Sequence, residues 1–239
     1  MRRGHSFEGV IGGTWDSRAD AWEQVARSDA FLRLRDVLIA VAAPRRGETV
    51  LDLGSGTGLL TLAAARKACK VIALDASAEM LARTSRNLGA EGMGGIELIH
   101  GDMRRIPLPD ESVDLVVSSY AFHHLGDDGK ELAAAEALRV LRPGGRIVVV
   151  DMMFQLSLHR RDRRIIASKA GALLRRGPAG AWRLAKNAVR IVRRRWEQPA
   201  SMEWWAEMLE RRGFASVAVR PLEHEAGLAT GTKPSVIRH

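Results

Sequence analysis

A run of glycines behind an acid is the feature of the sequence best suited to chemistry. The stretch VLDLGSGTGLL, residues 50–60, places Gly54, Gly56 and Gly58 two residues apart after Asp52. Glycine reaches positive φ, and its missing side chain leaves room for a ligand against the backbone. Where such a run leads from a strand into a helix, free N–H groups also face the ligand. The spacing predicts a ligand-binding loop, with a glycine turn that only packs as the alternative.

The same spacing argues against a dinucleotide. A dinucleotide-binding loop has the pattern G-x-G-x-x-G, and Leu59 occupies the position of its third glycine. A nicotinamide-dependent oxidoreductase is therefore the weaker enzyme hypothesis. A binding preference for NAD would reveal it.

A second group of residues could transfer protons as general acids or bases. The stretch SSYAFHHL, residues 118–125, contains Tyr120, His123 and His124. Imidazole titrates near neutral pH and a phenol can donate a hydrogen bond, so these three are the candidate catalytic residues. The alternative is a packed aromatic turn with one solvated histidine. We expect no metal site, because adjacent histidines point apart.

Alternating strands and helices must position these loops. Short runs rich in β-branched residues and leucine predict buried parallel strands, and the stretches between them have helical spacing. The expected strands span residues 50–53, 71–74, 96–100, 113–118 and 146–150. A helix over 201–213 and strands near 216–222 and 227–230 complete the pattern. This is a doubly wound α/β fold, which binds ligands at the carboxyl ends of its strands.

Four motifs in order resemble those of the class I S-adenosylmethionine-dependent methyltransferases. The motifs are the acid-and-glycine loop, VIALD ending at Asp75, GDM at 101–103, and the stretch LPDESVDLVVSSYAFHHL, which is followed by LRPGGRIVVVD. They cover about residues 48–151. Within that family, the sequence most resembles the ubiquinone- and menaquinone-biosynthesis-like branch, whose members methylate many small molecules.

The resemblance implies a fold and roles for the site residues. The sheet would be Rossmann-like and seven-stranded, mostly parallel with an antiparallel last strand. Asp75 would accept hydrogen bonds from both ribose hydroxyls, and Asp102 would meet the adenine amino group. Asp52 would order the loop and the methionine amino group, or else only cap loop amides. The cofactor-binding residues implied are Asp52, Gly54, Ser55, Gly56, Gly58, Asp75, Ala76, Asp102, Met103 and Ser118.

The chain is expected to form one domain, because 239 residues, 46% of them hydrophobic, suit a single core. Its parts would be a helical cap (1–46), a cofactor-binding core (47–151), a basic helical lid (152–198) and a C-terminal helix with strands (199–239). Residues 13–40 read as a helix that carries Trp15, Trp22 and Phe31. In relatives such a segment closes over the cofactor and acceptor, so that Trp15 and Asp16 would touch substrate. Packing in the core is the favoured reading of this aromatic stripe.

The positive charge belongs to one segment. The chain has a net charge of +9, but residues 159–196 hold 13 Lys or Arg and a single acid, and the rest of the chain sums to −3. Part of this segment predicts a basic amphipathic helix, which suits an anionic membrane surface. The alternative is a cover over the acceptor site with solvated arginines. Nucleic acid is disfavoured, because residues 119–122 read SYAF where enzymes that methylate base amino groups carry Asn/Asp-Pro-Pro-aromatic.

Cysteine content and hydropathy exclude other classes. One cysteine, Cys69, permits neither a disulfide framework nor a thiolate metal cluster, and no apolar run has the length of a membrane span. We expect a cytoplasmic protein, with a peripheral place on the inner face of the membrane as the alternative. The resemblance implies methyl transfer from S-adenosylmethionine to an O, N or C nucleophile of a small, amphiphilic or lipid-like molecule, which leaves S-adenosylhomocysteine. A membrane-docked lipid methyltransferase and a non-catalytic cofactor-binding module are the alternatives.

Overall fold

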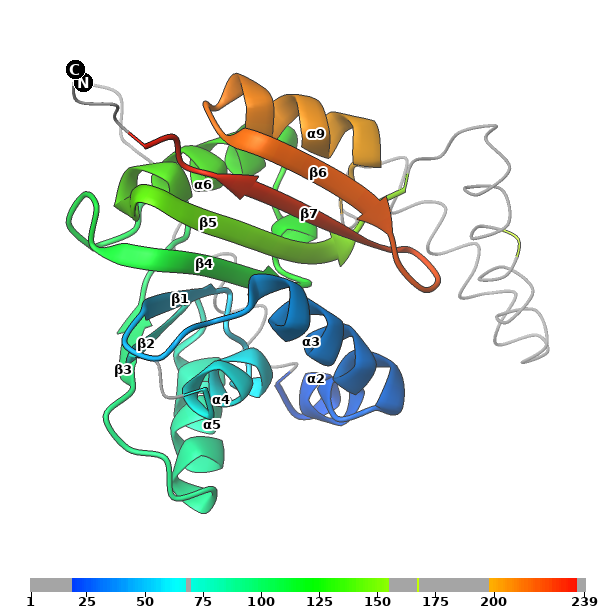
Figure 1. Cartoon of the computed structure of the whole chain (residues 1–239). Coiled ribbons are helices and arrows are strands. Elements are labelled where there is room, and N and C mark those ends of the chain that lie inside the picture. The colour runs from blue at the N-terminus through cyan, green and yellow to red at the C-terminus, as the bar shows by residue number, and fades with distance from the viewer. Residues whose placement is uncertain (1–18, 68–69, 155–166, 168–197, 236–239) are drawn as a thin grey trace, which may run out of the picture.

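A seven-stranded sheet forms the middle layer of the molecule. The computed structural model describes residues 19–67, 70–154, 167 and 198–235 (Figure 1). The strands are β1 (Thr49–Leu53), β2 (Lys70–Asp75), β3 (Glu97–His100), β4 (Val113–Ser119), β5 (Leu141–Met152), β6 (Ala215–Pro221) and β7 (Ala226–Thr232). Their order is β3-β2-β1-β4-β5-β7-β6, and β7 runs in the direction opposite to all the other strands. The expected fold with an antiparallel last strand is confirmed.

Helices cover both faces of the sheet (Figure 1). They are α2 (Ala19–Ala26), α3 (Asp29–Ala42), α4 (Leu59–Ala65), α5 (Ala78–Ala90), the 3-10 turn η1 (Phe122–His124), α6 (Asp127–Val140) and α9 (Met202–Arg211). Ile147 and Val149 of β5 cluster with residues of α6 and α9, whereas Val148 and Val150 cluster with α3 and α4. Burial on both faces explains why this strand reads as an unbroken apolar run.

Two boundaries differ from the sequence prediction. The pattern over 13–40 predicts one helix, whereas the structure has α2 and α3 with a break at Ser28. The Ser28 hydroxyl donates to the Val25 carbonyl at 2.7 Å there, and Ser28 precedes the first turn of α3. β5 begins at Leu141 rather than at 146, because Leu141 pairs with Val113 of β4 across a register shift, and Gly144 and Gly145 exchange backbone hydrogen bonds with Lys233, just after β7.

Several predictions fall outside the described residues. They concern Trp15, Asp16, Cys69 and the basic segment 159–196, of which only residue 167 is described. The membrane contact expected of that segment stays a prediction. In the part of the chain that the structure describes, no helix combines the length and apolar character needed to cross a membrane.

Arg146 joins the middle of β5 to the end of α3. Its Nε donates to the Ala42 carbonyl at 2.8 Å and its Nη2 to the Ala43 carbonyl at 2.9 Å. The guanidinium also binds both carboxylate oxygens of Glu48 at 2.9 Å, which lowers the pKa of Glu48. A cation here satisfies carbonyl groups that the end of a helix leaves unpaired. Arg146 therefore holds the end of α3 against β5.

Replacing Arg146 with methionine should lower the free energy of unfolding by about 2 kcal/mol, because two carbonyl groups and Glu48 lose their partner. Arg142→Met is the matched control: this side chain is 45% exposed and pairs with Asp114 at 2.7 Å, so its loss should cost less than about 1 kcal/mol. Urea denaturation measures both, and equal costs would contradict the role of Arg146. Folding lowers the pKa of Glu48, so the stability that Arg146 provides through Glu48 is present above pH 4.5, the ordinary pKa of that carboxyl, and is lost as the pH falls further. The cost of Arg146→Met should therefore approach that of Arg142→Met at low pH.

Candidate active site

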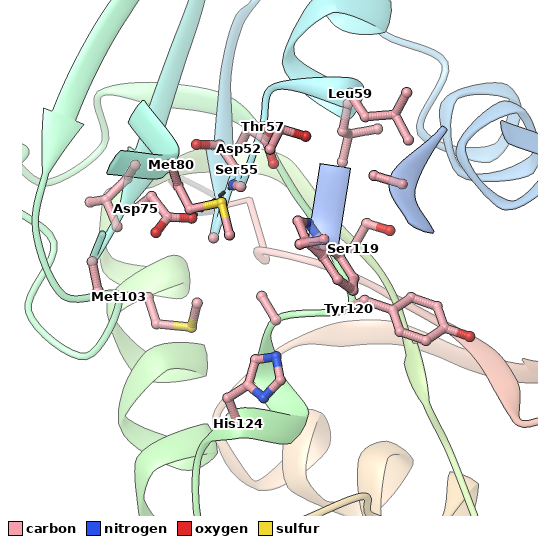
Figure 2. A pocket seen from close by; sticks show the side chains of 18 of the residues that line it. Asp52, Ser55, Thr57, Leu59, Asp75, Met80, Met103, Ser119, Tyr120 and His124 are labelled. Atoms are coloured by element: carbon pink, nitrogen blue, oxygen red, sulfur yellow. Dashed lines mark hydrogen bonds between the residues drawn. The ribbon is translucent and has the colours of Figure 1, made fainter. Parts of the chain in front are cut away.

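A cavity lies at the carboxyl ends of β1, β2 and β4 (Figure 2). Its walls are residues 54–57 of the glycine loop (residues 54–58), the turns after β2, β3 and β4, and helices α2 and α3. Figure 2 shows Asp75 and Met103 on one side and Ser119 and Tyr120 on the other. The strand order reverses between β1 and β4, and open α/β sheets bind their ligands at such a point.

The glycine loop is held by the neighbouring strand. The N–H groups of Gly54 and Ser55 both donate to the Leu74 carbonyl, at 2.8 and 3.0 Å. All three glycines of the loop have positive φ. A Cβ on Gly54 would lie within 3.0 Å of the Ala121 Cβ, in the turn after β4. The missing side chain therefore lets two walls of the cavity meet.

Asp52 has a carboxylate oxygen without a partner. The side chain is buried, and the Thr61 hydroxyl donates to its Oδ2 at 2.6 Å. Among the described residues, neither Asp52 Oδ1 nor Ser55 Oγ has a hydrogen-bond partner. Burial raises the pKa of Asp52 to about 7, although the hydrogen bond from Thr61 acts in the opposite direction. A cationic or N–H group of a ligand would satisfy this buried oxygen.

Asp75 ends β2 and binds the backbone of two loops. Its Oδ2 accepts from the Gly56 N–H and its Oδ1 from the Ser77 N–H, both at 2.8 Å. Burial raises the pKa of Asp75, and the two hydrogen bonds oppose the rise. Each carboxylate oxygen keeps a second lone pair, so Asp75 can still accept from ligand hydroxyls. Ala76, the next residue, also lines the cavity.

Asp102 and Met103 line the cavity after β3. The Arg104 guanidinium binds the Asp102 carboxylate, and the Arg104 N–H donates to Oδ1 at 2.8 Å. Burial opposes ionisation, but the hydrogen bonds from Arg104 outweigh it and lower the pKa of Asp102. An ionised acceptor of this kind suits an amino group of a ligand.

Two predicted cofactor residues, Gly58 and Ser118, do not line the cavity. Gly58 caps α4, and a Cβ on it would lie 2.8 Å from Thr84 Cγ2. The Ser118 hydroxyl is buried and donates to the Leu53 carbonyl at 2.7 Å. Ser119 lines the cavity instead, because successive side chains of a strand point to opposite faces.

The three candidate catalytic residues have different surroundings. Tyr120 and His124 line the cavity, whereas His123 is buried outside it. His123 Nδ1 lies 2.5 Å from Oδ1 of the buried Asp151. The ring centroids of His123 and His124 are 3.9 Å apart. His123 thus contacts His124 from behind rather than facing a ligand.

Sequence analysis missed part of the cavity wall. Trp22 and Phe31, for which packing in the core was the favoured reading, are half-buried, pack against each other and line the cavity. Arg35 and Met80 line it too. The spacing of Phe31 and Arg35, four residues apart on one helix, is a signal that could have found Arg35. Met80 offered no such signal.

Comparisons with known proteins agree with this geometry. A family model described as a methyltransferase domain matches residues 50–145. The demethylmenaquinone methyltransferase of Clavibacter sepedonicus is 32% identical over 200 residues, which cover 81% of this chain and 76% of that protein. An uncharacterized methyltransferase of Geobacillus thermodenitrificans is also 32% identical, over 59% of this chain. The match spans 63% of that relative's length.

Solved structures share the fold at low identity. A SAM-dependent methyltransferase from Aquifex aeolicus superposes with a TM-score of 0.64 at 19% identity, covering 92% of this chain and 97% of that one. The [4+2]-cyclase SpnF superposes with a TM-score of 0.71 at 17% identity, covering 95% and 96%. With the sequence relatives, these findings establish that the chain belongs to the class I S-adenosylmethionine-dependent methyltransferase family. The Clavibacter relative also fits the expected menaquinone-like branch.

The residues present fit the cofactor of this family. The unpartnered oxygens of Asp52 and Ser55 suit its amino-acid end, and Asp75 can accept from its ribose hydroxyls. Asp102 and Met103 suit its adenine.

Proposed function

We propose that this protein transfers a methyl group from S-adenosylmethionine to an O, N or C nucleophile of a small amphiphilic molecule. The observation that carries the proposal is the buried, unpartnered Asp52 Oδ1 in a cavity that also presents Asp75 and the glycine loop. When bound, S-adenosylmethionine supplies the methyl group, and its carbon–sulfur bond breaks as the bond to the acceptor forms. The residues of the chain bind and align the two partners, which is most of the catalysis that such a reaction needs.

Turnover is tested by the formation of S-adenosylhomocysteine during incubation with S-adenosylmethionine and a panel of quinols, phenols and amines. Product formation that depends on one class of acceptor would support the proposal. Cofactor binding without turnover on any acceptor would favour the non-catalytic module. This distinction matters because SpnF, a cyclase, has the same fold.

Asp52 is the expected partner of the cofactor's ammonium group. With a pKa of about 7, the Asp52 carboxyl is only partly ionised at neutral pH before binding. A neighbouring cation favours the ionised form, so binding should release roughly half a proton at pH 7, more at pH 6 and almost none at pH 8.5. Calorimetry in phosphate and Tris, whose heats of ionisation differ, measures this release. Identical heats in the two buffers at pH 7 would contradict the pairing, and Asp52→Asn should abolish the release.

His124 is the side chain placed to accept a proton from the acceptor. Tyr120 lines the cavity beside it, but burial and the charges of Glu225 and Asp151 raise the pKa of its phenol, so Tyr120 stays protonated and can only orient the acceptor. Behind His124, the charge of His123 and its hydrogen bond overcome the effect of burial and lower the pKa of Asp151. The ionised Asp151 holds the His123 ring against His124, which keeps the His124 ring in place.

Removing the His124 imidazole should lower kcat at pH 7 by about 100-fold, the usual scale of general-base catalysis. His124→Ala should leave the affinity for S-adenosylhomocysteine unchanged and should recover activity as the pH rises and the acceptor ionises unaided. Tyr120→Phe keeps the packed ring and should mainly raise KM. Steady-state rates from pH 6 to 10 measure these effects. A His124→Ala enzyme with the wild-type kcat and pH profile would show that no base acts here.

A further inference from the structure

Helix α3 presents an aromatic ring and a cation to the cavity, one turn apart. Phe31 and Arg35 are four residues apart, so they lie on the same face of the helix, and both line the cavity. The neighbouring stripe of Leu34 and Leu38 is buried in the cluster that also holds β4 and β5 residues. The packing of that stripe fixes which side of α3 turns toward the site.

Phe31 is the middle ring of three. Its centroid lies 5.4 Å from that of Trp22, with the rings nearly perpendicular at 83°, and 4.7 Å from that of Tyr120. All three side chains line the cavity. Such a wall offers ring faces and edges in several orientations, which favours a flat unsaturated ring.

Arg35 adds a positive charge beside this wall. Its Nε donates to Asp36 Oδ1 at 2.8 Å, and its side chain is 22% exposed. Asp36 is 66% exposed, so the pair is largely solvated and weak. Asp36 takes up two of the three guanidinium nitrogens, since Nε and Nη2 lie 2.8 and 2.7 Å from its Oδ1. A guanidinium in this state can bind a second carboxylate.

Tyr120 of the aromatic wall lies across the cavity from Asp75 and Met103, whereas Trp22 reaches the glycine loop, where a Cβ on Gly56 would lie 3.2 Å from its Nε1. Figure 2 shows Asp75, Met80 and Met103 on one side of the cavity, and Leu59, Ser119 and Tyr120 on the opposite side. Phe31 packs on Tyr120, and Arg35 is one turn from Phe31. Ribose and adenine would occupy the first side, so the second side is left for the acceptor.

We infer that the acceptor is an aromatic carboxylic acid, with its ring against Phe31, Trp22 and Tyr120 and its carboxylate on Arg35. This inference rests on the proposed function, because it assigns the remainder of the cavity to a second substrate. The aromatic wall binds the ring by contact and hydrophobic burial. Arg35 selects the anion and sets which ring substituent can face His124. Neutral quinols would lack the second interaction.

The test uses the full-length protein saturated with S-adenosylhomocysteine and two pairs of probes: 4-hydroxybenzoate and 1-hydroxy-2-naphthoate, each against its carboxamide. Calorimetry should give at least about tenfold tighter binding of the acid than of the amide in each pair, as expected of a charge-assisted hydrogen bond. In Arg35→Gln this ratio should fall to near one. Phe31→Leu should weaken acid and amide together and leave the ratio unchanged.

Arg33→Gln is the matched control, because Arg33 lies on the same helix, is 57% exposed and pairs with Glu223 at 3.3 Å. It should keep the wild-type ratio. Equal binding of acid and amide by the wild-type protein, or no binding of either, would overturn the inference. So would a ratio that survives Arg35→Gln. In each case, retained affinity for S-adenosylhomocysteine leaves the proposed function standing, whereas loss of that affinity in the wild-type protein would count against the function itself.

Discussion

Replacing Gly54 with alanine should abolish measurable cofactor binding and destabilise the protein by about 2–5 kcal/mol. The left-handed conformation of this residue, with φ +70°, costs a side-chain-bearing residue about 1–2 kcal/mol. The new Cβ would also lie within 3.0 Å of the Ala121 Cβ, and overpacking of that kind costs about 1–3 kcal/mol more. Relief requires the loop to move away from the turn after β4. Because the loop places Ser55 and Gly56, the cavity changes with it.

Gly47→Ala is the control that distinguishes the cost of a positive φ from the cost of the steric contact at Gly54. Gly47 also has positive φ, at +87°, but a Cβ there would meet no atom within 4 Å. This variant should cost only about 1 kcal/mol and bind S-adenosylhomocysteine normally. Urea denaturation and calorimetry on both variants make the comparison. Equal losses of stability, with binding intact in both, would mean that the contact between Gly54 and Ala121 is unimportant.

Removing the Asp75 carboxylate should weaken binding of S-adenosylmethionine by about 100-fold or more. The change takes away the acceptor expected for two ribose hydroxyls, which is worth about 1–3 kcal/mol. It also leaves the N–H groups of Gly56 and Ser77 without partners, so the glycine loop loses one of its fixed points. Asp75→Ala should therefore lose more affinity than the ribose contact alone explains.

Asp114→Ala is the control for this experiment. Asp114 also accepts a backbone hydrogen bond, from the Thr49 N–H at 2.8 Å, but Thr49 begins β1, and the cavity lies beyond the other end of that strand. This variant should lose stability and keep its affinity for the cofactor. Calorimetry at constant pH compares the two variants. An unchanged affinity in Asp75→Ala would remove Asp75 from the site.

The sequence was most informative where a local pattern and a tertiary requirement coincide. Buried parallel strands need unbroken apolar runs, so the run at 147–150 indicated a central strand. The loop after Asp52 needs glycines for its backbone conformation, and the spacing of the glycines was visible. The acid at Asp75 follows a strand, and parallel strands bring their carboxyl ends to one edge. These features were enough to predict the fold, the glycine loop and the position of Asp75.

The rest of the site depends on facts that the sequence pattern does not contain. Whether Ser118 or Ser119 faces the cavity depends on the pleat of one strand. Which of His123 and His124 turns inward depends on a partner far along the chain, Asp151. The role of Phe31 depends on the approach of α3 to the turn after β4. Packing between segments far apart in the chain decides the last two.

Calorimetric titration of the purified protein with S-adenosylmethionine, S-adenosylhomocysteine and NAD shows which cofactor the cavity binds. A cavity of this composition should bind the two sulfur ligands with micromolar dissociation constants and should not bind NAD, because Leu59 stands where a dinucleotide loop needs glycine. Binding of NAD, with no binding of either sulfur ligand, would show that the cavity is not a site for S-adenosylmethionine.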